Sequence, residues 1–178
     1  LQTIETFWSL FAKRYAGRNV IFAYDLRNEP AVPWTATPAI QKRWNDWLRR
    51  HYAYPSLDAL AQAWGRKATT IDSGELPPPQ DENESSQAEL LAYQLFREDL
   101  ADAWTRRQVK AIKAADPDAL CTVGFIQWSV PSLLPGLRHY SAFRPERQAP
   151  LLDFLEIHFY PFSDGAYEYR NAEDELKN

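Results

Sequence analysis

The stretch that decides the fold reads VIFAYDLRNEP from Val20 to Pro30. Its first eight residues are typical of a buried strand, and the strand ends in an amide and a carboxylate, Asn28 and Glu29. Parallel sheets carry their chemistry at the carboxyl ends of their strands. Because Pro30 closes the strand and fixes the exit of the loop, we expect Glu29 to be held on rigid backbone, as general acid catalysis requires.

Helices and strands are expected to alternate on both sides of this stretch. Apolar residues at helical spacing predict helices over about 3–15, 38–52, 57–64 and 87–115, with Gly17, Ser56 and Gly65 at their ends. Further strands are predicted over 120–126 and 151–160. A polar, mobile insertion loop is expected at about 66–86, a proline-punctuated loop over 130–150, and the start of a last helix at Asn171. This order predicts a single α/β domain with parallel strands joined by right-handed crossovers.

Composition excludes several classes of protein. A hydrophobic fraction of 45% and an aromatic fraction of 14% predict a globular domain. The net charge of −4, without a basic stripe, argues against nucleic acid as a partner. No apolar run approaches the roughly 20 residues of a membrane span, and the compartment stays open between secreted, periplasmic and cytoplasmic. The single cysteine, Cys121, cannot form an internal disulfide and is expected to be a small buried side chain.

Polar and aromatic side chains follow all three predicted strands. The strand ends carry three pairs: Asn28 and Glu29, Gln127 and Trp128, and His158 and Tyr160. Because parallel strands end at one edge of a sheet, we expect these groups to converge, with alternation placing Glu156, His158 and Tyr160 on one face. Such a mixture of acid, amide, imidazole, phenol and indole suits sugar hydroxyls and the apolar faces of sugar rings. Trp34 and Trp128 fit a sugar platform and ordinary packing equally well.

Structural alternatives exist for each of these residues. Glu29 also fits a surface turn, Asn28 a turn cap, and His158 with Tyr160 a buried structural pair. The sequence holds no cluster of His or Cys at metal-ligand spacing, no glycine-rich nucleotide loop and no serine-hydrolase elbow. We therefore predict neither a metal nor a cofactor. Four tryptophans at helical spacing are predicted to pack in the core: Trp44, Trp47, Trp64 and Trp104.

Two sets of motifs carry a resemblance to known enzymes. The Asn28-Glu29-Pro30 strand resembles the fourth strand of the clan A (β/α)8 glycoside hydrolases, and His158-Phe159-Tyr160 resembles the sixth strand of the cellulase and mannanase family 5. The segments 44–48 and 54–65 resemble the fourth helix and the insertion of the family 42 β-galactosidases. The resemblance covers the whole chain as the middle of a TIM barrel, roughly strands 4 to 6 with their helices.

The resemblance implies a retaining β-glycoside hydrolase acting on an oligo- or polysaccharide. Glu29 matches the acid/base, Asn28 the residue that binds the sugar 2-hydroxyl, and His158 and Tyr160 the lining of the cleavage subsite. It further implies a nucleophile at the end of a seventh strand, which this chain does not reach. Since 178 residues are fewer than the roughly 250 of a complete barrel, we expect a segment that is inactive alone and leaves its apolar barrel interior exposed.

Burial and a nearby carboxylate are expected to raise the pKa of Glu29. Glu156 is expected to lie about 6–7 Å below the rim of the site, too deep to replace the nucleophile. Two other hypotheses remain open at this point: a non-catalytic carbohydrate-binding or degenerate barrel, and a purely structural α/β domain.

Overall fold

The computed structural model describes residues 2–35, 37–66, 74–80, 85–129, 140–158 and 160, and the backbone of 162–163 and 166–167. Helices α1 (Gln2–Tyr15), α2 (Pro38–His51), α3 (Leu57–Ala63) and α4 (Gln87–Ala115) accompany strands β1 (Ala23–Asn28), β2 (Leu120–Ile126) and β3 (Glu156–His158). Shorter elements are η2 (Gln127–Ser129), α5 (Pro145–Gln148), η4 (Ala149–Leu151), β4 (Phe162–Ser163) and β5 (Ala166–Tyr167). The helix expected from Asn171 lies outside the described residues.

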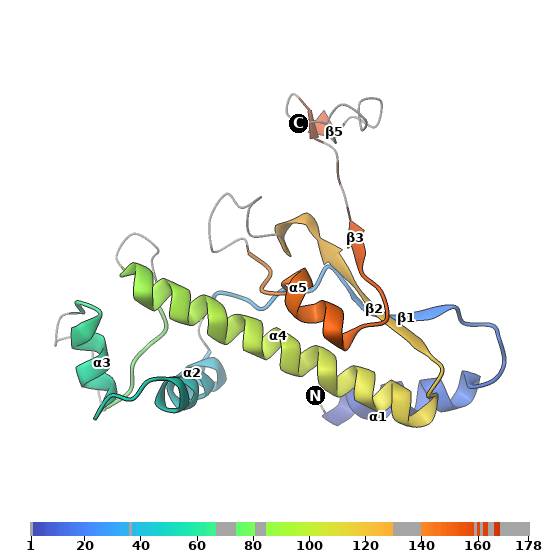
Figure 1. Ribbon diagram of the computed structural model, residues 1–178, viewed down its shortest axis with the longest axis horizontal. Coiled ribbons are helices and arrows are strands. Elements are labelled where there is room, and N and C mark those ends of the chain that lie inside the picture. The colour runs from blue at the N-terminus through green and yellow to red at the C-terminus, as the bar shows by residue number, and fades with distance from the viewer. Residues whose placement is uncertain are drawn as a thin grey trace.

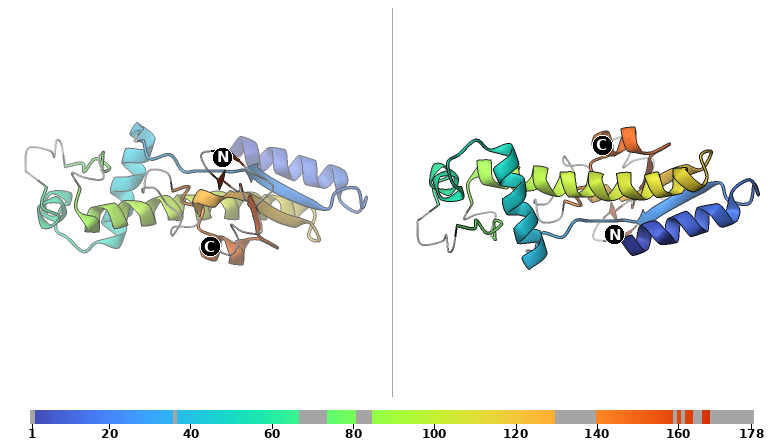
Figure 2. Two further views of the ribbon diagram at one scale, coloured as in Figure 1. Left: turned by 90° about the horizontal axis from the view of Figure 1, so that it is seen from above. Right: turned by 90° about the horizontal axis from the view of Figure 1, so that it is seen from below.

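The three main strands form a parallel sheet in the order β1-β2-β3, and β4 and β5 form a separate antiparallel pair. Helices α1 and α4 lie side by side along one face of the sheet (Figure 1 and Figure 2). The core between these layers is a cluster of buried apolar side chains that includes Ala12, Tyr24, Leu26, Ile112, Cys121, Val123 and Phe125. The predicted α/β fold with parallel strands is confirmed.

The predicted helix ends are confirmed at several positions. Ser56, the predicted cap of α3, accepts the Ala59 N–H on Oγ at 3.1 Å and so satisfies an otherwise unpaired amide of the first turn. Thr37, which the sequence analysis did not name, caps α2 in the same way, since its Oγ1 accepts the Ile40 N–H at 3.3 Å. Gly17, which follows α1, has a φ of 68°, the left-handed conformation that favours glycine at a helix end.

A second core lies at the other end of α4, where α2 and α3 pack against its N-terminal half (Figure 2). Trp44 is fully buried, and its ring stacks against those of Trp47 and Trp64 at centroid distances of 5.6 and 6.3 Å. Trp104 packs instead in the first core, where it meets the Phe143 ring edge-on. The packing role predicted for these four tryptophans is confirmed.

Part of the predicted polar loop is packed, which corrects the expectation for residues 74–80. Leu76 is fully buried in the second core. The Asn45 side chain accepts the Leu76 N–H at 2.8 Å and donates to the Leu76 carbonyl at 3.2 Å, so it replaces a strand partner for this segment. The remaining loop residues, 67–73 and 81–84, lie outside the described residues.

Two strands are shorter than the sequence predicted. Strand β1 begins at Ala23, and the preceding Val20 and Phe22 are 68% and 82% exposed instead of buried. Strand β3 covers only Glu156–His158, because Pro150 lies in the 3-10 turn η4 and residues 152–155 form no ladder with β2. Asp153 ties this segment to β2 through its side chain, which accepts the Cys121 N–H at 2.8 Å.

The exposed face of the sheet also differs from the expected apolar interior. Toward the carboxyl ends of the strands this face carries Glu156, His158 and an exposed Asp25. Phe22 and Phe154, which precede β1 and β3, contact each other at the opposite end. Exposed apolar side chains on β3 include Ile157, which alternation places on the other face. Among the described helices, none combines the length and the apolar character needed to cross a membrane.

Candidate active site

Glu29, His158 and Tyr160 meet above the ends of β1 and β3. Oε1 of Glu29 accepts a 2.5 Å hydrogen bond from the Tyr160 hydroxyl and lies 3.0 Å from Nδ1 of His158. The two strands are not neighbours, because β2 lies between them, so this contact crosses the middle strand. The convergence expected for these three residues is therefore present in the structure.

The backbone of Glu29 has an uncommon conformation. Its φ is 46°, in the left-handed region that a residue with a side chain adopts at a cost of order 1 kcal/mol. Its N–H donates to the carbonyl of Gly124 at 2.7 Å, which holds the residue against β2. Pro30, buried directly after it, restricts the exit of the chain. The expectation of a rigidly held carboxyl group is consistent with these contacts.

The pKa of Glu29 is lowered, which corrects the expected rise. The hydrogen bond from Tyr160 is the largest cause and the one from His158 the second, since both stabilise the charged carboxylate. Burial acts in the opposite direction, but the side chain keeps 22% of its surface exposed and desolvation is the smaller effect. No second carboxylate raises this pKa among the described residues.

His158 lies between two carboxyl groups. Nδ1 faces Glu29, and Nε2 lies 3.4 Å from Oε1 of Glu156. Both carboxylates raise the pKa of His158, Glu29 most, because each favours the protonated ring. The shared face predicted for Glu156 and His158 is confirmed, and the imidazole separates Glu156 from Glu29.

Of the other predicted site residues, three lie near the strand ends and one, Trp34, lies in the second core. Gln127 belongs to the site, since its Oε1 accepts the Tyr160 N–H at 3.4 Å. Asn28 is exposed at the end of β1, opposite Gly124, and Trp128 is half-buried in η2. Trp34 lies in the second core, where its Nε1 donates to the Pro79 carbonyl at 3.0 Å, so the structure supports the packing alternative for this residue.

Two residues of the site were missed by the sequence analysis. Asp25 accepts the Gly124 N–H on Oδ1 at 3.0 Å, and the His158 ring lies directly over Gly124. A carboxylate inside a strand and a glycine in the middle of the next strand are the signals that point to them, because both are depleted from strand interiors.

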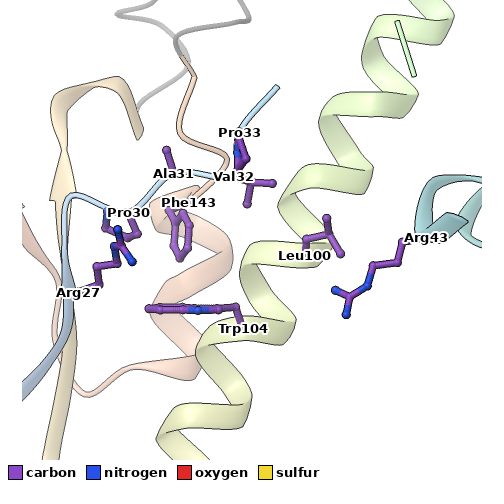
Figure 3. Close-up of a pocket in the computed structure, with 9 residues that line it drawn as sticks. All are labelled: Arg27, Pro30, Ala31, Val32, Pro33, Arg43, Leu100, Trp104 and Phe143. Atoms are coloured by element: carbon purple, nitrogen blue, oxygen red, sulfur yellow. The ribbon is translucent and has the colours of Figure 1, made fainter. Parts of the chain in front are cut away.

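A cavity of about 320 Å³ lies beside the loop that follows Glu29. Figure 3 shows that loop residues 30–33 form one wall, while Leu100 and Trp104 of α4 and Phe143 form another. Arg27 and Arg43 approach the cavity from opposite sides. The lining does not include Glu29, His158 or Tyr160, so the cavity is separate from their cluster. No group of three potential metal ligands occurs within the described part of the chain.

A family model described as Beta-galactosidase, that of glycoside hydrolase family 42, matches residues 2–176. The chain belongs to this family. The beta-galactosidase BgaA of Thermus sp is 28% identical over 129 residues, which cover 66% of this chain and 19% of that protein.

Solved family structures share the fold. The cold-adapted beta-galactosidase from Rahnella sp. R3 has a TM-score of 0.68 and 22% identity, over 93% of this chain and 23% of that one. The beta-galactosidase from the psychrophilic Marinomonas ef1 has a TM-score of 0.67 and 18% identity, over 97% of this chain and 26% of that one. The chain thus spans about a quarter or less of the length of these proteins.

These comparisons sort the resemblances found in the sequence. The family 42 resemblance and the partial parallel barrel are confirmed. The family 5 resemblance, with its cellulase and mannanase specificity, receives no support, since the family 42 model accounts for residues 2–176.

Proposed function

We propose that this chain supplies the acid/base carboxyl group, Glu29, to the active site of a retaining β-glycosidase whose substrate is a β-galactoside. The observation that carries the proposal is the double hydrogen bond on Oε1 of Glu29, from Tyr160 and His158, in a chain of family 42. Support for the substrate class comes from relatives named beta-galactosidases. Asn28, Gln127 and Trp128 at the same strand ends are proposed to contact the sugar.

The chemistry requires Glu29 in two protonation states. As an acid it protonates the leaving oxygen, and as a base it later activates water. The hydrogen bonds from Tyr160 and His158 favour the base form. A second carboxylate at roughly 5–5.5 Å, the nucleophile of a retaining enzyme, favours the acid form by raising the pKa. We propose that this nucleophile belongs to a part of a longer enzyme, and that these 178 residues alone hydrolyse no aryl β-glycoside.

Asn28 has a defined part in this proposal. An oxocarbenium-like transition state places positive charge on the anomeric carbon, and a hydrogen bond to the sugar 2-hydroxyl strengthens as that charge develops. The exposed position of Asn28, next to Glu29 and opposite Gly124, leaves its amide accessible to a sugar.

The leaving-group dependence of the Glu29→Gln variant in the full-length enzyme tests the proposal. A group acting as general acid contributes about 10²–10⁴-fold to the rate. We therefore expect such a loss of kcat/KM on alkyl β-galactosides, whose leaving alcohols need a proton. On dinitrophenyl β-galactoside, whose leaving group departs as an anion, glycosylation should change little. If wild type and Glu29→Gln had equal kcat/KM on the alkyl and on the dinitrophenyl β-galactoside, Glu29 would not be the acid/base.

A second candidate is a barrel that binds carbohydrate without catalysis. The lowered pKa of Glu29 favours it, because an ionised carboxylate accepts hydrogen bonds from sugar hydroxyls without needing a proton of its own. Calorimetric binding of galactosides to the full-length protein, together with no turnover of dinitrophenyl β-galactoside, would identify this function. Turnover that depends on Glu29 would exclude it.

A further inference from the structure

Gly124 of β2 is connected to both outer strands of the sheet. Its N–H donates to Oδ1 of Asp25 at 3.0 Å, and its carbonyl accepts the Glu29 N–H at 2.7 Å. In the ladders it is paired with Asn28 of β1 on one side and with Glu156 of β3 on the other. Glu29 is therefore bonded to this glycine directly, and the His158 ring lies over it.

Strand β1 contains an irregularity at this point. Asp25 is paired with Thr122 and Asn28 with Gly124, so three steps along β1 correspond to two along β2. Such a bulge leaves backbone amides without ladder partners. The Asp25 carboxylate supplies the missing acceptor, because Oδ1 receives the Arg27 N–H at 3.1 Å as well as the Gly124 N–H. The side chain thus closes the bulge that the extra residue opens.

The bulge changes the direction of the residues that follow it. Strict alternation would place Arg27 on the same face as Asp25, beside His158. Arg27 instead lines the cavity with Trp104 and Phe143, as Figure 3 shows. Its guanidinium is thereby kept away from the His158 ring. Glu29 leaves the bulge with its left-handed φ of 46° and its carboxylate on His158.

The absence of a side chain at Gly124 makes room for the His158 ring. A Cβ atom at this position would lie 2.9 Å from Nε2 and 3.0 Å from Cε1 of His158, and 3.4 Å from Oδ2 of Asp25. The first distance is shorter than a carbon atom tolerates. The imidazole therefore occupies the volume that any other residue at 124 would fill. The ring would have to move to admit a methyl group, and its contact with Glu29 would change.

We propose that Asp25 and Gly124 are positioning residues for the Glu29–His158 pair. The Asp25 carboxylate fixes the bulge from which Glu29 emerges with its left-handed φ, and Gly124 leaves the space in which the His158 ring reaches Glu29. The catalytic meaning of the pair rests on the function proposed above. The positional claim itself is independent of that function, since it concerns only the contact between the two side chains.

The protonation of His158 reports directly on this contact. The groups that face its ring are Glu29, Glu156, Asp25 and the phenol of Tyr160. We suggest following the ring by NMR in the full-length protein with labelled histidine, with the signal assigned by its loss in His158→Gln. In Gly124→Ala the pKa of His158 should fall toward the ordinary value of about 6.5, because the ring leaves Glu29. An unchanged titration in this variant would overturn the proposal.

Kinetics provide the second measurement. A displacement of about 1 Å in an active site can cost about 100-fold in rate, and we expect a loss of this order in kcat/KM for Gly124→Ala. In a His158→Ala background the same change should cost less than about threefold, because its effect passes through the ring. A full additional loss in that background would show that the methyl group disturbs something else.

Two variants of Asp25 separate the effect of its hydrogen bonds from the effect of its charge. Asp25→Ala removes the acceptor and should lower both the pKa of His158 and kcat/KM, whereas Asp25→Asn keeps an oxygen and should recover most of the loss. Asp58→Ala, at an exposed aspartate in the first turn of α3, is the matched control. Equal titration in Asp25→Ala and wild type would refute the role of Asp25. An inactive wild-type enzyme would refute the proposed function instead, while the NMR titration would still decide the positional claim.

Discussion

The hydroxyl group of Tyr160 donates a 2.5 Å hydrogen bond to Oε1 of Glu29, a residue 131 positions earlier in the chain. It is the largest single influence on the pKa of Glu29, which it lowers because the bond is strongest to the ionised carboxylate. Tyr160 follows β3 and Glu29 follows β1, so the bond also links the two outer strands across β2.

Replacing Tyr160 with Phe should raise the pKa of Glu29. The ring remains while the donor is lost, so the basic limb of the kcat/KM profile of the full-length enzyme, where Glu29 loses the proton that it must donate, should move to higher pH. A shift of one pH unit corresponds to about 1.4 kcal/mol of interaction with the charged form. Tyr54→Phe, at an exposed tyrosine before α3, is the control and should leave the limb in place. If Tyr160→Phe and Tyr54→Phe had the same pH profile, the Tyr160 hydroxyl would not lower the pKa of Glu29.

The Glu29–His158 pair should stabilise the fold only within a defined pH window. The pKa of Glu29 is lowered, so its contribution is present above its ordinary value of about 4.3 and is lost as the pH falls through the folded-state value. The pKa of His158 is raised, so its contribution is present below about 6.5 and is lost as the pH rises through the folded-state value.

Thermal unfolding of Glu29→Gln, His158→Gln and the double variant measures this window. The double-mutant-cycle coupling energy, taken from the free energies of unfolding, should be largest between about pH 4.3 and 6.5. In this range both groups are charged in the folded and unfolded states. The coupling energy should shrink on either side as one partner loses its charge. Coupling that stays constant across the whole range would contradict an ionic contact.

Local rules predicted most of the helices and their ends. The cap at Ser56 and the left-handed Gly17 depend on a few neighbouring residues, so the sequence pattern contains them. The strand over 120–126 was predicted with its observed bounds, whereas β1 and β3 were predicted too long, since apolar composition alone does not show where a partner strand ends. Leu76 illustrates the same limit, because its burial depends on Asn45, a residue far away in the chain.

Three residues of the site were predicted, but Asp25, Gly124 and the electrostatics of the site were not. Glu29, His158 and Tyr160 follow from the rule that parallel strands end at one edge. The pKa of Glu29 was predicted in the wrong direction, because two hydrogen bonds outweigh burial when the side chain stays partly exposed. The bulge at Asp25 depends on register, which strand alternation by itself does not determine.

Arg97 should be important for the stability of the loop that follows Glu29. It is 1% exposed on α4, and its guanidinium donates to the carbonyls of Val32 and, at 2.6 Å, of Tyr140. Arg97→Ala removes charge-assisted hydrogen bonds and leaves carbonyls unsatisfied, which should cost about 3 kcal/mol in the free energy of unfolding. Urea denaturation measures the loss, and Arg106→Ala, exposed on the same helix, is the control. Equal midpoints would show that the loop is held by other contacts.

Cys121 should be unreactive in the folded protein. It is fully buried in β2, and burial raises the pKa of its thiol to about 11. Because the thiolate is the reactive form, both its small population and its inaccessibility slow alkylation. In this chain Cys121 is the only cysteine, so iodoacetamide labelling should follow global unfolding, and its rate across a urea series should report the free energy of unfolding. Rapid labelling without denaturant would show that β2 opens locally, in conflict with its place at the centre of the sheet.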